Sequence, residues 1–315
     1  MNTCPITYRQ CGENKYSPEG LHMLNTRLDE LLPLPLSALE QRREAIRLAG
    51  KLSIQGMQPK LSAVLSLNEA TFIPVAKYGH YILKPQHADY PQLPENEGIT
   101  MHLARVAGLE VPLSGLVFSA DGSMTYFIRR FDRVGRFGKL ATEDFAQLAG
   151  RERSTKYDYS MEKIVNLIDR YCSFPHVEKA RLFQRFLYFW LTGNEDMHLK
   201  NFSVIRQNGK VTLSPLYDCL NSTAVYLALG RDYDGIEEIA LPLNGKKKNL
   251  TMRDIIDYFG KDRLSLTGKV IDKTIQQFAA VMDEWIPLID RSFLNDDIKK
   301  PYKEVLERRR AVLKI

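Results

Sequence analysis

Cysteine is scarce in this chain, and long apolar runs are absent. The 315 residues include four cysteines, at positions 4, 11, 172 and 219, with no Cys-x-x-Cys pair or His-rich partner. We therefore expect reduced thiols rather than a disulfide framework or a structural metal site. No run approaches the roughly 18 apolar residues that span a bilayer, and the first residues lack the basic and apolar regions of a signal peptide. We expect a cytoplasmic protein without membrane association.

Charge of neither sign dominates the composition. Lysine and arginine number 44 against 38 acidic residues, which gives a net charge of +6. This charge suits an acidic partner or a nucleic acid without requiring one. The sharpest basic run, Lys246 to Lys248, is predicted to be a solvated loop rather than a patch that binds phosphates. The contents of 44% hydrophobic and 26% charged residues are typical of a folded globular protein, and the length suffices for two lobes.

The familiar glycine patterns of nucleotide-binding loops are also absent. The stretch 53–60 has one glycine, Gly56, instead of the three in Gly-x-Gly-x-x-Gly, and Gly50 to Ser53 is not a Walker motif. The Asp-Phe-Gly motif of protein kinases is missing as well, since Cys219 follows Asp218. A nucleotide site therefore has to be argued from other residues.

The first 132 residues predict a small antiparallel sheet with a helix beside it. A helix is predicted over 37–49, where Ser37 and Glu40 form a capping box. A second helix is predicted over 95–107, closed by Gly108. Apolar alternation and turn residues predict strands at 61–67, 71–75, 80–84, 113–118 and 125–131.

From residue 133 onward the pattern becomes mostly helical. The only predicted interruptions are strands over 202–206 and 211–214, joined at Asn208-Gly209. Apolar periodicity predicts helices at 160–172, 177–191, 253–259, 270–289 and 297–312. The sequence thus predicts an α+β fold with a β-rich N-terminal lobe, residues 1–132, and a helical C-terminal lobe, residues 133–315. A hinge is predicted near Arg129 to Arg133.

One loop of the helical region carries the spacing Asp-x-x-x-x-Asn. Asp196 and Asn201 have the offset of the catalytic loop of protein kinases, in which the Asp accepts the hydroxyl proton and the Asn holds a metal ion. Asp218 follows beyond the predicted hairpin, where a second carboxylate ligand for Mg²⁺ is expected. Alone, Asp218 fits a turn or a helix cap equally well.

The β-rich region contains the lysine that is predicted to bind the phosphates of a nucleotide. Lys84 ends the third predicted strand, as the phosphate-pairing lysine of kinases does. Glu97 is the predicted ion-pair partner of Lys84, and Glu95 is a rival for that role. His198 is predicted either to contact a phosphate or to make a structural hydrogen bond, and Lys200 either to neutralise the transferred phosphate or to be solvated.

Two of these loops, taken together, resemble the HipA family of bacterial toxin kinases. Residues 53–61 are similar to that family's Ser-Ile-x-Gly-x-Gln-x-Lys loop, and residues 193–203 to its Gly-x-x-Asp-x-His-x-Lys-Asn-x-Ser loop. The resemblance covers roughly residues 50 to 310 and includes Ile82 to Pro85, Glu95 to Glu97, Arg129 to Asp132 and Tyr217-Asp218. Because the loop serine already stands at 53, the chain is similar to HipT, the shortened kinase of three-component HipBST systems. In those systems the separate protein HipS corresponds to the missing N-terminal subdomain.

The resemblance implies a two-lobed, HipA-like kinase fold and a role for each matching residue. Asp196 is the implied catalytic residue, Asn201 and Asp218 hold Mg²⁺, and Lys84 binds the phosphates of ATP. The implied hinge that reads adenine through the backbone is formed by Arg129, Arg130 and Phe131. The other residues implied at the nucleotide are Ser53, Gly56, Gln58, Lys60 and His198, and Ser53 is the implied autophosphorylation site.

The resemblance also implies an activity and partners. The chain is expected to be a serine/threonine protein kinase toxin that phosphorylates an aminoacyl-tRNA synthetase, which for HipT is tryptophanyl-tRNA synthetase. The expected partners are a HipS-like small protein and a HipB-like DNA-binding antitoxin, so that contact with DNA is indirect. A phosphate on Ser53 adds about −1.5 to −2 charge and should weaken ATP binding. A small-molecule phosphotransferase and an inactive antitoxin-binding module are the alternatives.

Overall fold

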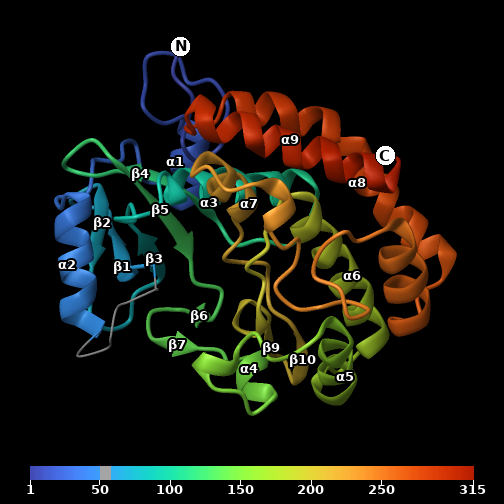
Figure 1. The fold of residues 1–315 in the computed structure, drawn as a ribbon. Helices are drawn as coiled ribbons and strands as arrows, with labels where there is room; N and C mark the ends of the chain where they lie inside the picture. The colour runs from blue at the N-terminus through green and yellow to red at the C-terminus, as the bar shows by residue number, and fades with distance from the viewer. Residues whose placement is uncertain (50–57) are drawn as a thin grey trace. The chain divides into compact units, whose positions relative to one another are not determined.

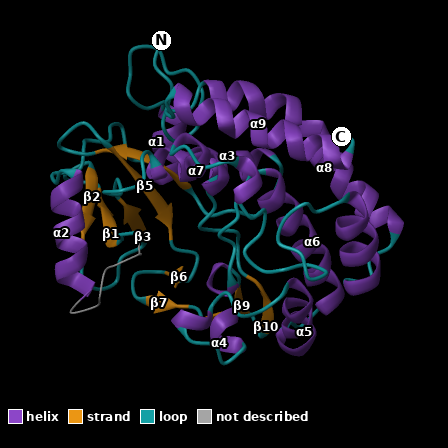
Figure 2. Ribbon diagram, viewed as in Figure 1, coloured by secondary structure: helices purple, strands orange, loops and turns teal. Residues whose placement is uncertain are grey.

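The structure, a computed structural model, describes residues 1–49 and 58–315 and divides the chain into two compact units (Figures 1 and 2). Unit 1 comprises residues 1–103, 111–138 and 288–294, and unit 2 comprises residues 104–110, 139–287 and 295–315. Each unit is therefore built from separate stretches of chain. The predicted lobes, residues 1–132 and 133–315, are instead two continuous stretches of chain, and this division stays a prediction.

Unit 1 contains a five-stranded antiparallel sheet with the strand order β2-β1-β3-β5-β4. All five predicted strands are confirmed, although the last ends at Arg129 instead of residue 131. The register places Lys84 opposite Tyr126. The strands are β1 (Leu61–Ser66), β2 (Thr71–Pro74), β3 (Tyr81–Lys84), β4 (Ser114–Phe118) and β5 (Met124–Arg129).

Two helices of unit 1 begin after a serine cap. Ser17 caps α1 (Pro18–Leu24) by accepting the N–H of Gly20. Before α2 (Ala38–Ala49), the Glu40 carboxylate accepts the Ser37 N–H at 2.8 Å, which confirms the capping box. Helix α3 (Leu93–Val106) begins two residues before its predicted start. In Figure 1, α2 lies beside the β1–β2 edge of the sheet.

An aromatic cluster forms part of the core of unit 1. The ring of Phe72 lies 5.0 Å from that of Phe127 and 4.9 Å from that of Tyr81, measured between centroids. The three residues come from β2, β5 and β3, and all are buried. Burying each such ring contributes about 1.5–3 kcal/mol, so the cluster stabilises the sheet that carries Lys84.

Unit 2 is mainly helical, as Figure 2 shows. Helix α6 (Pro175–Leu191) has eleven buried residues, among them Phe183, Tyr188 and Trp190. The five predicted helices of this region are confirmed, but the third, predicted over 253–259, is a π-helix, η4 (Arg253–Arg263), longer than predicted. The others are α5 (Met161–Tyr171), α8 (Gly268–Asp290) and α9 (Asp296–Leu313), while the short α4 (Phe145–Leu148) and α7 (Ser222–Ala228) were not predicted.

A small sheet lies next to the loop that carries Asp196. Strands β8 (Thr142–Asp144), β9 (Ser203–Gln207) and β10 (Lys210–Leu213) pair in the order β10-β9-β8. Asn208 and Gly209 both have positive φ, which confirms the predicted hairpin turn. The prediction of only two strands after residue 132 is wrong, because β8, β6 (Arg133–Val134) and β7 (Gly138–Lys139) are also strands. Strands of two or three residues are too short to show an apolar period.

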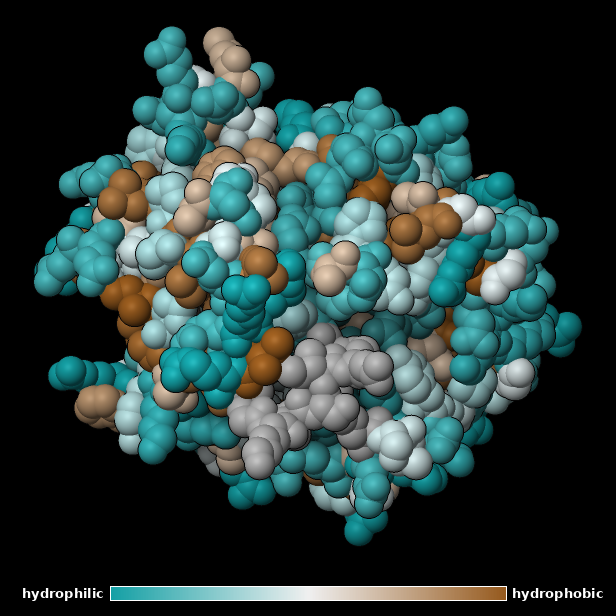
Figure 3. Space-filling model, turned by 60° about the vertical axis from the view of Figure 1, so that its left-hand side comes forward, coloured by the Kyte–Doolittle hydropathy of each residue, from teal (hydrophilic) through white to brown (hydrophobic). Residues whose placement is uncertain are grey.

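The face shown in Figure 3 is mostly hydrophilic, with apolar residues in small, separate groups. Helix α2 contributes the exposed side chains of Leu39 and Ile46. Single exposed apolar residues of this kind are common on folded proteins. Among residues 1–49 and 58–315, no helix has the length and apolar character needed to cross a membrane.

Candidate active site

The loop 193–203 leaves α6 through a position that only glycine fits. Gly193 has a φ of +74°, and a Cβ there would lie 2.4 Å from Asn221 Oδ1. The Gly193 carbonyl accepts the Thr223 N–H at 3.1 Å and the Thr223 hydroxyl at 3.0 Å. Asn221 in turn caps α7. The start of α7 therefore fixes the start of the loop.

Main-chain hydrogen bonds hold Asp196 and Asn201 in one compact turn. The His198 N–H donates to the Asp196 carbonyl at 2.9 Å, and the Asn201 N–H donates to the His198 carbonyl at 2.9 Å. The Asn201 amide nitrogen reaches the Asp196 carbonyl at 3.5 Å. Because the nitrogen faces the loop, the amide oxygen of Asn201 is directed elsewhere and can act as a metal ligand.

Two hydroxyl groups connect this loop to the segment that carries Asp218. The Tyr217 hydroxyl donates to the Lys200 carbonyl at 2.9 Å and lies 2.5 Å from Ser203 Oγ. Burial raises the pKa of Tyr217, so the phenol stays a neutral donor. Asp218 itself has a φ of +61°, a conformation that aspartate tolerates better than most residues. The structure thus brings Asp196, Asn201 and the Asp218 segment together within unit 2.

The donor set at this place fits magnesium bound together with phosphates. Asn201 and Asp218 offer an amide oxygen and a carboxylate, and Mg²⁺ is commonly held by one or two such groups plus the phosphates of a nucleotide. Within the described residues, no group of three or more His, Cys, Asp or Glu side chains could hold a metal ion alone.

Unit 1 contains the predicted ion pair. Lys84 Nζ lies 2.7 Å and 2.9 Å from the two carboxylate oxygens of Glu97, and both side chains are buried. Glu97 is thereby confirmed as the partner. The rival Glu95 accepts both of its contacts, at 2.7 Å, from the amide of Gln86. Burial raises the pKa of Glu95 to about 7, against the opposing effect of the Gln86 hydrogen bonds.

The predicted hinge is well ordered by its own contacts. The Arg129 N–H donates to the Leu113 carbonyl and the Arg130 N–H to the His80 carbonyl, each at 2.8 Å. The Arg130 guanidinium binds Asp132 through two hydrogen bonds, at 2.9 Å and 2.7 Å. A backbone contact from residues 129–131 to adenine would therefore use groups other than these two N–H donors.

The predicted phosphate loop is described only at its end. Ser53 and Gly56 lie outside the described residues. Gln58 is half-buried and Lys60 is exposed, just before β1. Their contact with a nucleotide stays a prediction.

His198 and Lys200 both have protein partners in unit 2. Lys200 Nζ binds Asp144 at 2.7 Å. His198 Nε2 lies 2.6 Å from Lys156 Nζ. Burial lowers the pKa of His198 despite the opposing effect of Asp196, so the neutral ring accepts the lysine proton donor. Both contacts are with protein groups, and a phosphate contact from either residue stays a prediction.

The sequence did not single out Lys156 or its neighbour Tyr157. The Tyr157 hydroxyl donates to Asp196 Oδ1. These two residues precede the loop by about forty positions and belong to no motif discussed above, so a contact with Asp196 has no local sequence signal. Tyr157 is thus an unpredicted neighbour of the candidate catalytic group.

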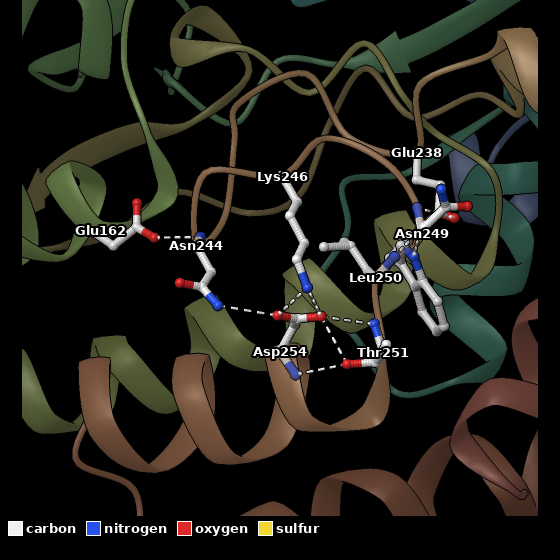
Figure 4. A network of polar contacts seen from close by, with 9 residues as sticks. Glu162, Glu238, Asn244, Lys246, Asn249, Leu250, Thr251 and Asp254 are labelled. Carbon is white, nitrogen blue, oxygen red and sulfur yellow. Dashed lines mark hydrogen bonds and ion pairs between the residues drawn. The ribbon is translucent and has the colours of Figure 1, made fainter.

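Lys246, the first lysine of the basic run, belongs to a separate polar network in unit 2, shown in Figure 4. Lys246 Nζ lies 2.9 Å and 3.0 Å from the carboxylate oxygens of Asp254, which also accepts from Thr251 and Asn244. Lys247 binds Glu237, and Lys248 binds a carbonyl. Every lysine of the run has a protein partner, so this network anchors a loop and is no evidence for phosphate binding.

Comparison with known proteins identifies the family. Residues 52–286 match the family described as HipA-like C-terminal domain. The chain is 30% identical over 305 residues to an inferred kinase of Haemophilus influenzae, covering 88% of each chain. It is 29% identical over 192 residues to the serine/threonine-protein kinase toxin HipA of Shewanella oneidensis, covering 54% of this chain but only 43% of that toxin.

Solved structures share the fold. HipA in the complex of Shewanella oneidensis HipA, HipB and operator DNA has a TM-score of 0.70 and 23% identity, covering 91% of this chain and 74% of that one. The Helicobacter pylori proinflammatory kinase CtkA has a TM-score of 0.53 and 19% identity, covering 74% and 86%. The predicted kinase-like α+β fold is thereby confirmed. Several of its relatives are named as kinases, and the chain belongs to the family of HipA-like C-terminal domain proteins.

Proposed function

We propose that this chain is an ATP- and Mg²⁺-dependent serine/threonine protein kinase of the HipT type, the toxin of a toxin–antitoxin system. The buried contact between Lys84 and Glu97 is the observation that carries the proposal. In protein kinases this ion pair must form before the lysine can bind the nucleotide phosphates. A buried pair is costly to maintain for stability alone, which favours a functional reason for it.

The roles of the other residues follow from their chemistry. Asp196 accepts the proton of the acceptor hydroxyl, and Lys84 binds the phosphates. Asn201 and Asp218 would hold Mg²⁺, which neutralises phosphate charge when bound. The backbone of residues 129–131 is the proposed contact for adenine, and Ser53, Gly56, Gln58, Lys60 and His198 are the other residues proposed to bind the nucleotide. Catalysis then comes mainly from positioning and electrostatics.

The proposed acceptor is a serine of an aminoacyl-tRNA synthetase, in particular tryptophanyl-tRNA synthetase, whose loss would stop translation. The proposed partners are a HipS-like protein and a HipB-like antitoxin, which makes contact with DNA indirect. The complex of Shewanella oneidensis HipA with HipB and operator DNA supports the proposal of a HipB-like antitoxin as a partner. The similarity to HipT supports the remaining assignments. Autophosphorylation of Ser53 would end activity by placing negative charge beside ATP.

The experiment is transfer of label from γ-³²P-ATP to a bacterial extract, with and without Mg²⁺, by the wild-type chain and by Asp196→Asn. One Mg²⁺-dependent labelled protein that disappears with Asp196→Asn supports the proposal, and its identification by mass spectrometry tests the synthetase. A labelled small molecule would instead indicate a small-molecule phosphotransferase. No label would indicate an inactive antitoxin-binding module.

A further inference from the structure

A short segment of unit 2, residues 152–158, lies on the loop that carries Asp196. Lys156 Nζ contacts His198 Nε2 at 2.6 Å, and the Lys156 carbonyl accepts the Leu199 N–H at 3.4 Å. The ring of Tyr157 meets that of His198 edge to face, with centroids 5.1 Å apart. The Tyr157 hydroxyl donates to Asp196 Oδ1. Four contacts therefore place this tyrosine at the candidate catalytic carboxylate.

The conformation of the segment is set locally. The Glu152 N–H donates to the Thr155 hydroxyl at 3.1 Å, and the Asp158 N–H donates to the Thr155 carbonyl at 3.0 Å. The Thr155 N–H donates to the Glu152 carbonyl at 3.2 Å and closes one turn of 3₁₀-helix, residues 153–155, two residues before Tyr157, and the Asp158 bond closes a further turn around Tyr157. The backbone around Tyr157 is therefore held by hydrogen bonds within residues 152–158 as well as by the contacts with the loop.

The side chain of Tyr157 is not a core side chain. It remains 41% exposed, so the ring can move away from Asp196 without leaving a buried cavity behind. Burial, together with the neighbouring Asp196, raises the pKa of Tyr157 and keeps the phenol protonated as a donor. Its contact with Asp196 is therefore a hydrogen bond that another hydroxyl group can replace.

We propose that Tyr157 occupies the position of the acceptor hydroxyl in the substrate-free chain, and that an acceptor must displace it to reach Asp196. The inference rests on the proposed role of Asp196 as the group that accepts the hydroxyl proton. A carboxylate oxygen already bound by the Tyr157 O–H is a poorer acceptor for a second hydroxyl. A water molecule makes too few contacts to displace Tyr157. A protein acceptor that also binds other parts of the chain can displace it, so Tyr157 favours a protein acceptor over water.

Water serves as the probe acceptor, since it requires no identified substrate. ATP hydrolysis is measured with the full chain and Mg²⁺ for wild type, Tyr157→Phe, Tyr159→Phe and the double variant Tyr157→Phe/Asp196→Asn. A hydrogen bond to a charged group corresponds to about a tenfold change or more in an equilibrium. We expect about tenfold faster hydrolysis for Tyr157→Phe. Tyr159, whose ring lies under Lys163, is the matched control and should leave the rate unchanged.

Two results of this assay would overturn the inference. One is an unchanged or lower rate for Tyr157→Phe, and the other is an increase that persists in the double variant. The absence of ATP turnover in every variant would remove the proposed function and the inference with it. Phosphate found on Tyr157 itself would show that the residue is an acceptor and not a barrier.

A second measurement is independent of turnover. Tyrosine labelled with ¹³C at Cζ gives one resonance for Tyr157, assigned through Tyr157→Phe. We expect Asp196→Ala to shift this resonance and to leave that of Tyr159 in place. A Tyr157 resonance that does not respond to Asp196→Ala would show that the contact is absent in solution, and it would overturn the inference even if the chain is an active kinase.

Discussion

The hydroxyl of Tyr217 lies 2.5 Å from that of Ser203 and donates to the Lys200 carbonyl at 2.9 Å. Tyr217 directly precedes Asp218, while Lys200 directly precedes Asn201. The two proposed metal ligands are therefore held relative to each other by one buried phenol. Supporting contacts of this kind typically control how well a metal site is formed.

Replacing Tyr217 with Phe should weaken the binding of Mg²⁺ more than it destabilises the fold. Removal of the hydroxyl costs about 1 kcal/mol of stability, and the loosened ligands should raise the Mg²⁺ concentration for half-maximal transfer by about tenfold. Phosphate transfer is measured as Mg²⁺ is titrated. Tyr171→Phe, which removes a single contact to the Leu148 carbonyl at 3.4 Å, is the control. An unchanged Mg²⁺ dependence would refute this role of Tyr217.

The Lys84–Glu97 pair predicts unequal effects at two neighbouring glutamates. Glu97→Gln leaves the buried Lys84 ammonium without its carboxylate, which should cost about 3 kcal/mol of unfolding free energy and weaken ATP binding. Glu95→Gln removes only a partner of Gln86 and should retain ATP affinity. Calorimetry measures the ATP affinity of each variant, and chemical denaturation measures its unfolding free energy. Equal losses of ATP affinity in the two variants would contradict the assignment of Glu97.

The choice between these two glutamates shows what the sequence could supply. A lysine at a strand end and an acidic residue at the following helix start were enough to predict the pair. Glu95 and Glu97 are two residues apart and so point to different sides of α3. The choice between them depends on how the helix rotates against the sheet, which only the structure shows.

Other features had no local signal at all. The helix at 38–49 was predictable because Ser37 and Glu40 form a capping box. By contrast, β8 is three residues long and exists because it pairs with β9. The contact of Tyr157 with Asp196 joins residues far apart in the chain. Pairings of this kind arise from tertiary packing and produce no periodic pattern of apolar residues in the sequence.

Gly193 should not tolerate a side chain. Gly193→Ala imposes an unfavourable φ and places its Cβ 2.4 Å from Asn221 Oδ1, so the unfolding free energy should fall by about 3 kcal/mol. Gly230→Ala is the matched control, since Gly230 has a φ of +83° but no neighbour within 4 Å. Denaturant unfolding of both variants separates the cost of the steric clash with Asn221 from the cost of a positive φ at alanine. Similar losses in the two variants would show that the Asn221 contact is unimportant.

Asp254 should make stability depend on pH in the acid range. Burial alone would raise its pKa, but hydrogen bonds from Thr251, Lys246 and Asn244 outweigh it and hold the pKa well below its ordinary value. A lowered carboxyl pKa contributes stability above the unfolded value, about 3.9, and this contribution is lost as the pH falls further toward the folded pKa.

The measurement is the unfolding free energy of Asp254→Asn between pH 3 and pH 7. We expect the variant to be about 2 kcal/mol less stable near pH 7, with a difference from wild type that shrinks below about pH 4. Asp257→Asn breaks an exposed pair with Lys261 in the same helix and should change stability by less than about 0.5 kcal/mol. A difference between Asp254→Asn and wild type that does not vary with pH would argue against the lowered pKa.

The central claim is that Asp196 accepts the proton of the acceptor hydroxyl. The direct measurement is the single-turnover rate of γ-phosphate transfer from ATP by wild type and Asp196→Asn, with ATP binding measured in parallel. A lost general base lowers the rate by about 10²–10⁴-fold, and we expect ATP affinity to remain within about threefold, since Asp196 acts on the acceptor and not on the nucleotide. A variant that transfers phosphate at the wild-type rate would contradict the account.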